Sequence, residues 1–326
     1  MKRWTTFVGW IAHREPATPI ALVRILAGLV ALGMLLNLHA SGVGAAIWLS
    51  EAHGGMQNAP LTSWIWRWLG PPEPALLWPL FWSGVAGAVL VLVGLGSRLG
   101  ALVLLQVLMA LQVLSPSSRG GFDSLLNNTL WLLVLAPSES TLSLWCRLRS
   151  GRWVSTVPRL AWVRYAMVYQ LTLMYWTTGV QKVGTDWWPW GDFHAVYYVL
   201  LQPPWARWDD GSWAGWIIPL TQIGTIGTMV LEMTWFMVPL ALFYRATRTR
   251  PGRLRALSNR LSLRTLYIAG GAAMHVGIWA FMNIGTFSLV AIALYPCAFH
   301  HDELVAWIRR RRLTGGAPLA PGAAAG

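Results

Sequence analysis

The feature that most constrains this chain is its series of apolar runs, several of which extend over 18 residues or more. A run of that length is long enough to cross a bilayer as an α-helix. Hydrophobic residues make up 55% of the sequence and charged residues 11%, whereas a soluble globular domain carries roughly 25% charged residues. Such apolar surface would be insoluble in water. The sequence therefore predicts an all-α, polytopic membrane protein embedded in the lipid bilayer.

We expect about eight transmembrane helices, which form a bundle over residues 18–300. Their expected bounds are residues 18–38, 75–95, 99–114, 124–136, 160–181, 216–244, 266–282 and 286–299. The sixth run exceeds one span, so we expect a tilted helix or one that begins on the membrane surface. Residues 1–17 are expected to form an interfacial segment, and residues 301–326 a basic, flexible cytoplasmic tail.

The positions of the basic residues predict the orientation of the bundle. If the N-terminus is cytoplasmic, the cytoplasmic segments hold 20 Lys and Arg residues and the opposite ones hold 4. This asymmetry follows the positive-inside rule, so both termini are expected on the cytoplasmic side of a cell membrane. We therefore attribute the net charge of +13 to orientation and expect no nucleic-acid partner.

Lys182 is the first candidate for chemistry, because the chain has only one other lysine, Lys2. It lies where the fifth apolar run meets a tryptophan cluster on the predicted outer side, and Asp186 follows four residues later. An amine kept at such a boundary is a candidate functional group. The alternative is that Lys182 only anchors the helix end by extending its ammonium group to the membrane surface.

Three further titratable or charged residues, Arg24, Glu232 and His275, fall inside apolar runs. Charges in hydrocarbon are costly and are functional candidates by default. At about 1.5 Å per residue, His275 lies about 13 Å below the outer turn, and Glu232 lies at a similar depth. Glu232 and His275 are expected to line one outward-open cavity together with Lys182. Alternatively, Glu232 pairs with Arg24 or a hydroxyl group, and His275 is a core histidine with satisfied hydrogen bonds.

The fifth helix carries polar and small residues at spacings of three and four, namely Tyr169, Thr172, Tyr175, Gly179 and Lys182. Residues at these spacings share one helix face, which usually turns toward the bundle interior. Tyr175 therefore joins the candidate binding residues, although such a stripe also serves helix packing alone. The histidines on the outer side lack the close spacing of metal ligands, so we expect no metal site.

Several short motifs stand in order along the chain. They are GVQKVGTDW around Lys182, followed by Gly191; NNTLWLLVL at 127–135; and the order His275, Ile284-Gly285, Phe287-Ser288 and Pro296. These motifs resemble those of the vitamin K-dependent γ-carboxylases and their bacterial relatives, the horizontally transferred transmembrane (HTTM) domain family. The first is similar to the family's lysine motif, the second to a segment of its fourth helix, and the third to its last two helices.

This resemblance implies a role for each matching residue. In the carboxylases, the matching lysine deprotonates vitamin K hydroquinone, so Lys182 is the expected base and vitamin K or menaquinone hydroquinone the expected cofactor. Asn128 and Asp186 would belong to the substrate-binding region with Glu232, His275 and Tyr175. The family's bacterial members place the chain in a bacterial inner or plasma membrane.

Two departures change what we expect of the reaction. Where the carboxylases have a functional histidine after the Asn-Asn pair, this chain has Thr129, which does not titrate. Only about 26 residues follow the eighth helix, whereas the carboxylases carry a large lumenal region there. We therefore expect quinol chemistry without carboxylation of protein glutamate. The alternative hypothesis is a non-catalytic scaffold or transporter-like protein that keeps the bundle alone.

Overall fold

The fold was analysed in a computed structural model that describes residue 9, residues 12–208 and residues 212–314. Its elements, in chain order, are β1 (Arg14–Pro16), α2 (Thr18–Ala40), α3 (Val43–Trp48), α4 (Trp64–Leu69), α5 (Pro74–Val93), α6 (Ser97–Gln112), α7 (Gly121–Leu135), α8 (Leu144–Ser150), β2 (Pro158–Leu160), α9 (Trp162–Val180), α10 (Ala195–Leu200), α11 (Ile218–Met233), α12 (Met237–Ala246), α13 (Arg253–Arg260), α14 (Leu263–Phe281), α15 (Phe287–Leu294) and α16 (His301–Thr314). The described chain is all-α, apart from one antiparallel pair of three-residue strands, β1 and β2.

Each of the eight expected runs forms helix, but few of these helices meet the criteria for a membrane span. Within the described residues, only α2 and α5 are both long and apolar enough, and the bent pair α11–α12 makes a third if it counts as one span. The apolar α6 and α15 are shorter than the roughly 20 residues that a bilayer requires. The structure thus supports an all-α bundle with two or three clear spans, and the number eight stays a prediction.

The sixth run does not form the single tilted helix that we expected. It divides into α11 and α12, whose axes differ by 55°. Pro239 lies in the first turn of α12, where proline is tolerated. In a continuous helix its ring would clash with the carbonyl group of Trp235, four residues earlier. The chain therefore turns at residues 234–236, directly after Glu232.

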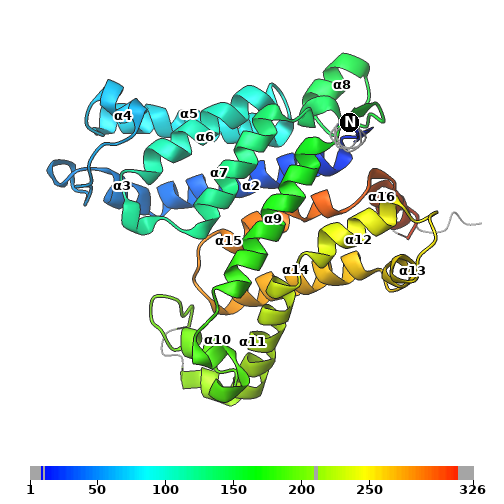
Figure 1. Cartoon of the computed structure of the whole chain (residues 1–326). Helices are drawn as coiled ribbons and strands as arrows, with labels where there is room; N and C mark the ends of the chain where they lie inside the picture. The colour runs from blue at the N-terminus through cyan, green and yellow to red at the C-terminus, as the bar shows by residue number, and fades with distance from the viewer. Residues whose placement is uncertain (1–8, 10–11, 209–211, 315–326) are drawn as a thin grey trace, which may run out of the picture.

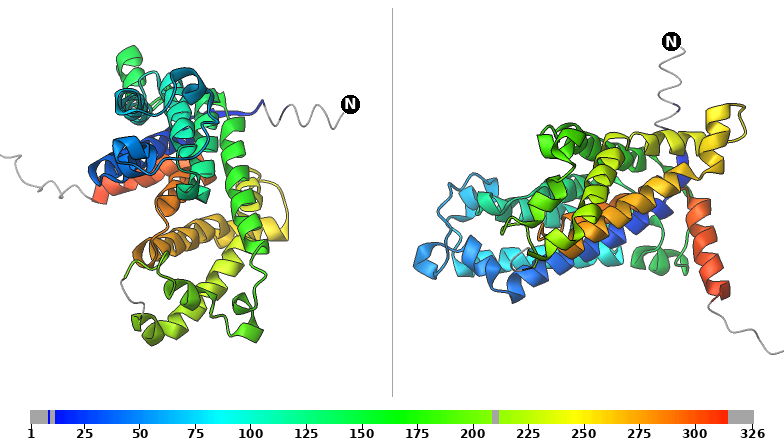
Figure 2. Two further views of the ribbon diagram at one scale, coloured as in Figure 1. Left: turned by 90° about the vertical axis from the view of Figure 1, so that its left-hand side faces the viewer. Right: turned by 90° about the horizontal axis from the view of Figure 1, so that it is seen from below.

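The helices form two layers joined by α9 and α15. The first layer contains α2, α5, α6 and α7, and the second contains α11, α12 and α14. α15 packs against α2 and α7 on one side and α14 on the other, and α9 contacts both α7 and α11. In the left view of Figure 2, the layer of α2, α5, α6 and α7 lies above the layer of α11, α12 and α14. α9 and α15 therefore hold the residues that join the layers.

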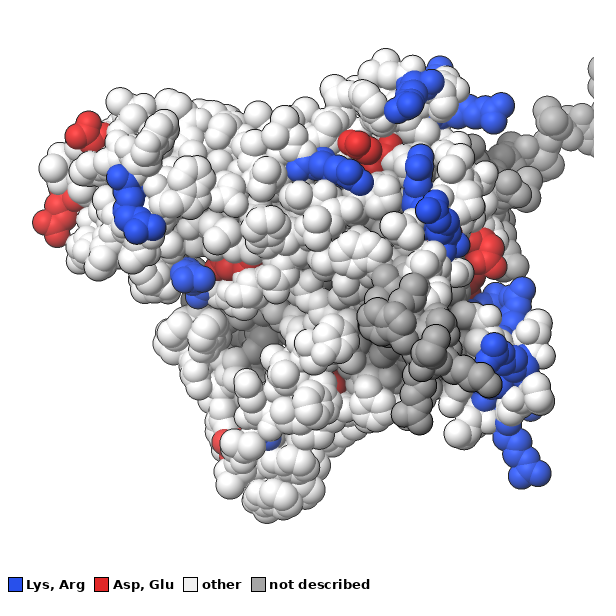
Figure 3. Space-filling view, turned by 45° about the horizontal axis from the view of Figure 1, so that its top comes forward, with Lys and Arg blue, Asp and Glu red and all other residues white. Residues whose placement is uncertain are grey.

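The two ends of the bundle differ in composition. We call the end with α8, α13 and the start of α16 the arginine-rich end, and the end with α3, α4 and α10 the tryptophan-rich end. Figure 3 shows the basic side chains gathered toward the first of these, beside a broad uncharged zone. The antiparallel pairing of β1 with β2, and a hydrogen bond of 2.8 Å between the Thr18 hydroxyl and His301 Nδ1, hold β1 and the start of α16 at the arginine-rich end. This agrees with the predicted alternation of the helices.

The segments outside the bundle differ from their predicted forms. Residues 301–314 form the helix α16, so this part of the expected flexible tail is structured. Residues 315–326 lie outside the described residues, as do most residues of the expected interfacial segment. Within that segment, Arg14–Pro16 forms β1.

Arg24 has a structural role that the sequence did not reveal. Its guanidinium group donates to the carbonyl oxygens of Val91 (2.5 Å), Leu92 (2.8 Å) and Leu142 (2.6 Å). Val91 and Leu92 belong to the last turn of α5, whose carbonyl groups lack partners within the helix and carry partial negative charge. Arg24 thus caps α5, and the alternative that it pairs with Glu232 is wrong.

Candidate active site

Lys182 lies two residues after the end of α9, at the tryptophan-rich end, as predicted. Its ammonium group forms an ion pair with the Glu232 carboxylate and also donates to the carbonyl oxygen of Thr178 at 3.3 Å. The side chains of Lys182 and Glu232 keep only 15% and 10% of their surface exposed. Two opposite charges are therefore held together near the surface, in a largely desolvated place.

Gly179 allows this pair to form. It is buried in the last turn of α9, where α9 crosses α11. A Cβ atom at this position would lie 2.9 Å from the backbone nitrogen of Met233 and 3.1 Å from Cβ of Glu232. The absence of a side chain lets the two helices approach closely, as small residues do at helix crossings in membranes. The expected stripe on α9 is thus partly a packing surface, and that packing brings Lys182 to Glu232.

Indole rings cover the Lys182 side of the pair. The Lys182 ammonium lies 4.9 Å from the ring centre of Trp187, a cation–π distance. Trp188 donates from Nε1 to the backbone carbonyl of Lys182 at 3.2 Å and stacks on Trp190. Asp186, the predicted neighbour, is half-buried and forms no ion pair with Lys182 in the described part of the chain. The anionic partner of Lys182 is Glu232, which comes from another helix.

His275 belongs to a separate buried hydrogen-bond chain. Its Nε2 lies 2.5 Å from the Tyr175 hydroxyl, which lies 2.7 Å from the Tyr295 hydroxyl. The other ring nitrogen, Nδ1, lies 3.4 Å from the Ser288 hydroxyl. All four side chains are buried, so their polar atoms depend on one another. This arrangement supports the alternative interpretation of His275 as a core histidine.

Trp235 packs against the tyrosines of the hydrogen-bond chain. Its ring centre lies 3.9 Å from that of Tyr175 and 5.9 Å from that of Tyr295. It follows Glu232 by three residues, at the turn between α11 and α12. The chain of Tyr175 and His275 therefore holds α9, α14 and α15 in place behind the ion pair, without a hydrogen bond to it.

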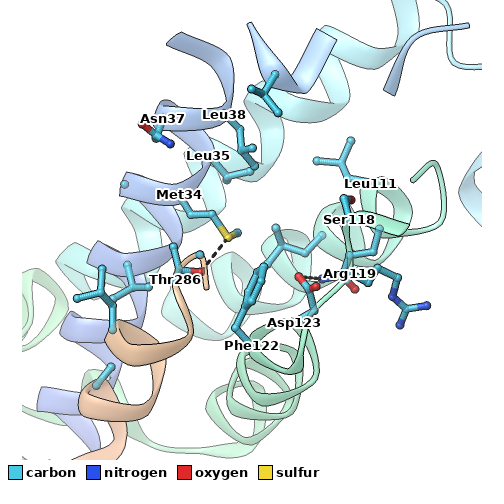
Figure 4. A pocket seen from close by; sticks show the side chains of 18 of the residues that line it. Met34, Leu35, Asn37, Leu38, Leu111, Ser118, Arg119, Phe122, Asp123 and Thr286 are labelled. Carbon is cyan, nitrogen blue, oxygen red and sulfur yellow. Dashed lines mark hydrogen bonds between the residues drawn. The ribbon is translucent and has the colours of Figure 1, made fainter. Parts of the chain in front are cut away.

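A cavity of about 870 Å³ lies elsewhere, between α2, α3, α6, α7, α14 and α15. Figure 4 shows Met34, Leu35 and Leu38 from α2 facing Phe122 and Asp123 from α7 across it. It is largely apolar, and its size is typical of ligand sites. Lys182, Glu232 and His275 do not line it. We expected these three residues to line one outward-open cavity. The 870 Å³ cavity is a different one, because none of the three lines it.

Asn128 is separate from both groups. It is exposed on α7 and lines a groove of about 510 Å³ between α7 and α9, with Tyr169 and Met174. Its neighbour Thr129 is buried, and its hydroxyl donates to the carbonyl oxygen of Leu125 at 2.7 Å. Neither side chain contacts Lys182 or Glu232.

Comparison with known proteins identifies the family. The family model described as the HTTM domain matches residues 13–250, which is more than half of the chain. The chain belongs to the HTTM family. Searches of curated proteins and of solved structures gave no match. The resemblance drawn from the short motifs is thereby confirmed at the level of the family, and HTTM membership makes the chain a membrane protein.

The matched HTTM region includes α9 and α11, and with them Lys182 and Glu232. His275 and Tyr295 lie beyond its end, although they pack directly onto Tyr175 within it. Sequence reasoning missed Tyr295 and Trp235. Tyr295 directly precedes Pro296 of the family motif, and Trp235 lies three residues from Glu232, so both had a signal in the sequence. No group of three or more His, Cys, Asp or Glu residues suited to a metal ion occurs among the described residues.

Proposed function

We propose that this HTTM protein removes a proton from a hydroxyl group of a lipid-soluble quinol, with Lys182 as the base. The observation that carries the proposal is the Lys182–Glu232 ion pair, held in a largely desolvated place beside the ring of Trp187. The carboxylate of such a pair can accept a proton from the ammonium group, and the amine can then act as the base. The ammonium group that re-forms provides a positive charge beside the quinol anion. Desolvation strengthens both effects.

The proton can move in two steps. The Lys182 ammonium passes a proton to the Glu232 carboxylate, which leaves a neutral amine beside a neutral acid. The amine then accepts the proton of the quinol hydroxyl. Lys182 is again an ammonium group, now beside the quinol anion, and Glu232 holds the transferred proton. The atoms and charges balance, and the positive charge faces the new negative charge.

The surroundings of Lys182 favour a substrate that arrives from the bilayer. Val183 is 80% exposed and Trp190 is 71% exposed. In a membrane protein, exposed apolar and indole groups at a helix end contact lipid and headgroups. A quinol ring at that depth would approach the ammonium group from the lipid side, and its apolar tail would stay among lipids. The Tyr175–His275 chain positions α9 and would not touch the substrate.

The test is turnover of reduced menaquinone or vitamin K by the protein in lipid nanodiscs. With oxygen present, a quinol and one O₂ give the quinone epoxide and water, and the epoxide is measured by chromatography. We expect epoxide from the wild type and a large loss in Lys182→Met and Glu232→Gln. Asp192→Asn is the matched control, because it removes an exposed carboxylate from the same loop. Labelled bicarbonate in the same reaction reports carboxylation.

Two results would reject the proposal. Absence of epoxide in the wild type, with correct folding shown by circular dichroism, would exclude this chemistry. Equal turnover in the wild type and Lys182→Met would exclude Lys182 as the base.

A second candidate function is binding of a lipid-soluble molecule without chemistry. The 870 Å³ apolar cavity favours it, because that cavity lies apart from the ion pair. Thr129 also favours it, since its hydroxyl is committed to a backbone carbonyl and offers no proton donor or acceptor to a substrate. A non-catalytic protein would retain added quinol unchanged in the same nanodiscs, and Lys182→Met would retain it equally well.

A further inference from the structure

A small polar cavity of about 150 Å³ lies at the arginine-rich end, far along the chain from Lys182. It is formed where α12, α13, α14 and α16 meet. Its polar lining comes from Arg245, Ser258, Asn259, Ser262, Arg264 and Glu303. This lining differs from that of the apolar cavity between α2 and α7, and it suits a small charged group.

The cations at this cavity outnumber the anions. Glu303 Oε1 accepts from Arg245 Nε at 3.0 Å and from Arg264 Nη2 at 2.5 Å. The other carboxylate oxygen accepts from the backbone N–H of His300 at 2.9 Å. One carboxylate thus serves two guanidinium groups and a backbone N–H group. A second anion would balance the remaining positive charge.

Arg264 carries the unused hydrogen-bonding capacity. It is 6% exposed, and its Nε and Nη1 have no hydrogen-bond partner among the described residues. One face of its guanidinium group lies on the ring of Phe299, 5.0 Å from the ring centre. The donors lie in the plane of the group, so this stacking leaves them free. Buried donors without a partner are costly, and an ion or an ordered ligand commonly accounts for them.

The N-terminus of α14 reaches the same cavity. Ser262, Leu263, Arg264 and Thr265 all line it, and α14 is 19 residues long. The first turn contains no acidic residue, and no side chain caps it in the described structure. A helix N-terminus presents backbone N–H groups and partial positive charge, which favour phosphate. The helix end and the unpartnered guanidinium group therefore converge on one small space.

We propose that this cavity binds a phosphate group, supplied either by the headgroup of an anionic phospholipid or by free phosphate. Arg264 would donate from its free nitrogens, Arg245 would add charge, and the first turn of α14 would donate backbone N–H groups. The cavity volume admits one phosphate group. Its place at the expected cytoplasmic surface is where basic pockets between helices meet anionic lipid headgroups. The proposal does not depend on the chemistry at Lys182.

Thermal unfolding in nanodiscs tests the site, because a ligand that binds only the folded state raises the unfolding temperature. The protein is compared in phosphatidylcholine alone, in phosphatidylcholine with phosphatidylglycerol, and in phosphatidylcholine with added inorganic phosphate. Native mass spectrometry counts the phosphatidylglycerol that each sample retains. We expect Arg264→Met to weaken binding by about tenfold or more, the usual effect of losing a charge-assisted hydrogen bond.

Two further variants keep the test decisive. Ser262→Asp places a carboxylate at the N-terminus of α14, where it balances the partial positive charge, and Asp tolerates the left-handed conformation of this residue (φ 49°). It should fold like the wild type and lose the response to the ligand. Arg149→Met removes an exposed arginine from α8 at the same end and should respond like the wild type.

The outcomes separate the two sources of phosphate. A response to phosphatidylglycerol that is lost in Arg264→Met and Ser262→Asp supports a lipid headgroup, and the same pattern with inorganic phosphate supports the free ion. An equal response in all four proteins would overturn the proposal, because it would reflect general attraction to the basic end. No response of the wild type to either ligand would also overturn it.

Discussion

Replacement of Lys182 by methionine should destabilise the protein by an amount that depends on pH. The substitution leaves the Glu232 carboxylate in its buried place without a cation. An uncompensated buried charge of this kind costs about 3–5 kcal/mol. The carboxylate can avoid this cost by taking up a proton. For an ordinary glutamate, protonation at pH 7 costs about 3.7 kcal/mol, since its pKa of about 4.3 lies roughly 2.7 pH units lower.

The cost of protonation sets both the magnitude and the pH dependence of the effect. At pH 5 it is only about 1 kcal/mol. In Lys182→Met, the folded state holds a proton on Glu232 that the unfolded state has lost at pH 7. Because the folded state binds more protons, stability falls as pH rises above about 4.3. The deficit of Lys182→Met relative to the wild type should therefore shrink by up to about 2.7 kcal/mol between pH 7 and pH 5.

Equilibrium unfolding by sodium dodecyl sulfate in mixed micelles, followed by far-ultraviolet circular dichroism, measures these differences. The double variant Lys182→Met, Glu232→Met removes both charges and should recover most of the loss, with little dependence on pH. Glu232→Met alone should cost less than Lys182→Met, because the long Lys182 side chain can extend to water at its helix end. An equal deficit of Lys182→Met at both pH values, or additive losses in the double variant, would refute the reasoning.

Three further predictions use the same unfolding measurement. Gly179→Ala places a Cβ atom 2.9 Å from the backbone of α11 and should cost about 1–3 kcal/mol; an unchanged stability would show that the crossing is loose. Tyr175→Phe removes the hydroxyl shared by a buried histidine and a buried tyrosine, and should cost about 1–3 kcal/mol, whereas the exposed Tyr169→Phe should cost little. Burial raises the pKa of Glu303, but its hydrogen bonds to a backbone N–H and to a buried guanidinium group outweigh this and lower it overall. The stabilisation by the Glu303 carboxylate should be complete above about pH 4.3 and be lost as pH falls further. The free energies of unfolding of Glu303→Gln and the wild type should therefore converge at low pH, and a constant difference between them would contradict this.

The sequence predicted those parts of the fold that depend on local composition. Apolar runs and arginine clusters located the helices and their alternation, because bilayer thickness and charge act on each segment separately. Lys182 lies at the tryptophan-rich end of α9 for the same reason. The break after Glu232 was missed, although Pro239 marks it. Residues 301–314 were expected to be flexible, and their arginines instead extend a helix that Glu303 fixes to α12 and α14.

The contacts of the candidate site depend on distances between helices, which a single sequence does not supply. Asp186 drew attention because it is four residues from Lys182, yet Glu232, 50 residues away, forms the ion pair. The Lys182–Glu232 pair forms because Gly179 lets α9 approach α11 closely. His275 was expected inside its helix, and it lies there in α14, but its bond to Tyr175 spans 100 residues and could not be foreseen. The apolar cavity has contributions from six helices, so no single segment predicts it.

The capping of α5 by Arg24 has a consequence for biogenesis. Helices enter the membrane in the order of their synthesis. An arginine at a helix centre costs about 2.5–3.5 kcal/mol on insertion scales, and Arg24, in the second turn of α2, carries part of that cost. The carbonyl groups that accept from Arg24 belong to Val91, Leu92 and Leu142. The ribosome makes them only after α2 has left it. We therefore expect α2 to insert incompletely in nascent chains that end before residue 91, and to settle once α5 arrives. Glycosylation mapping of such truncated chains, with Arg24→Leu as the comparison, would show whether insertion waits for these partners.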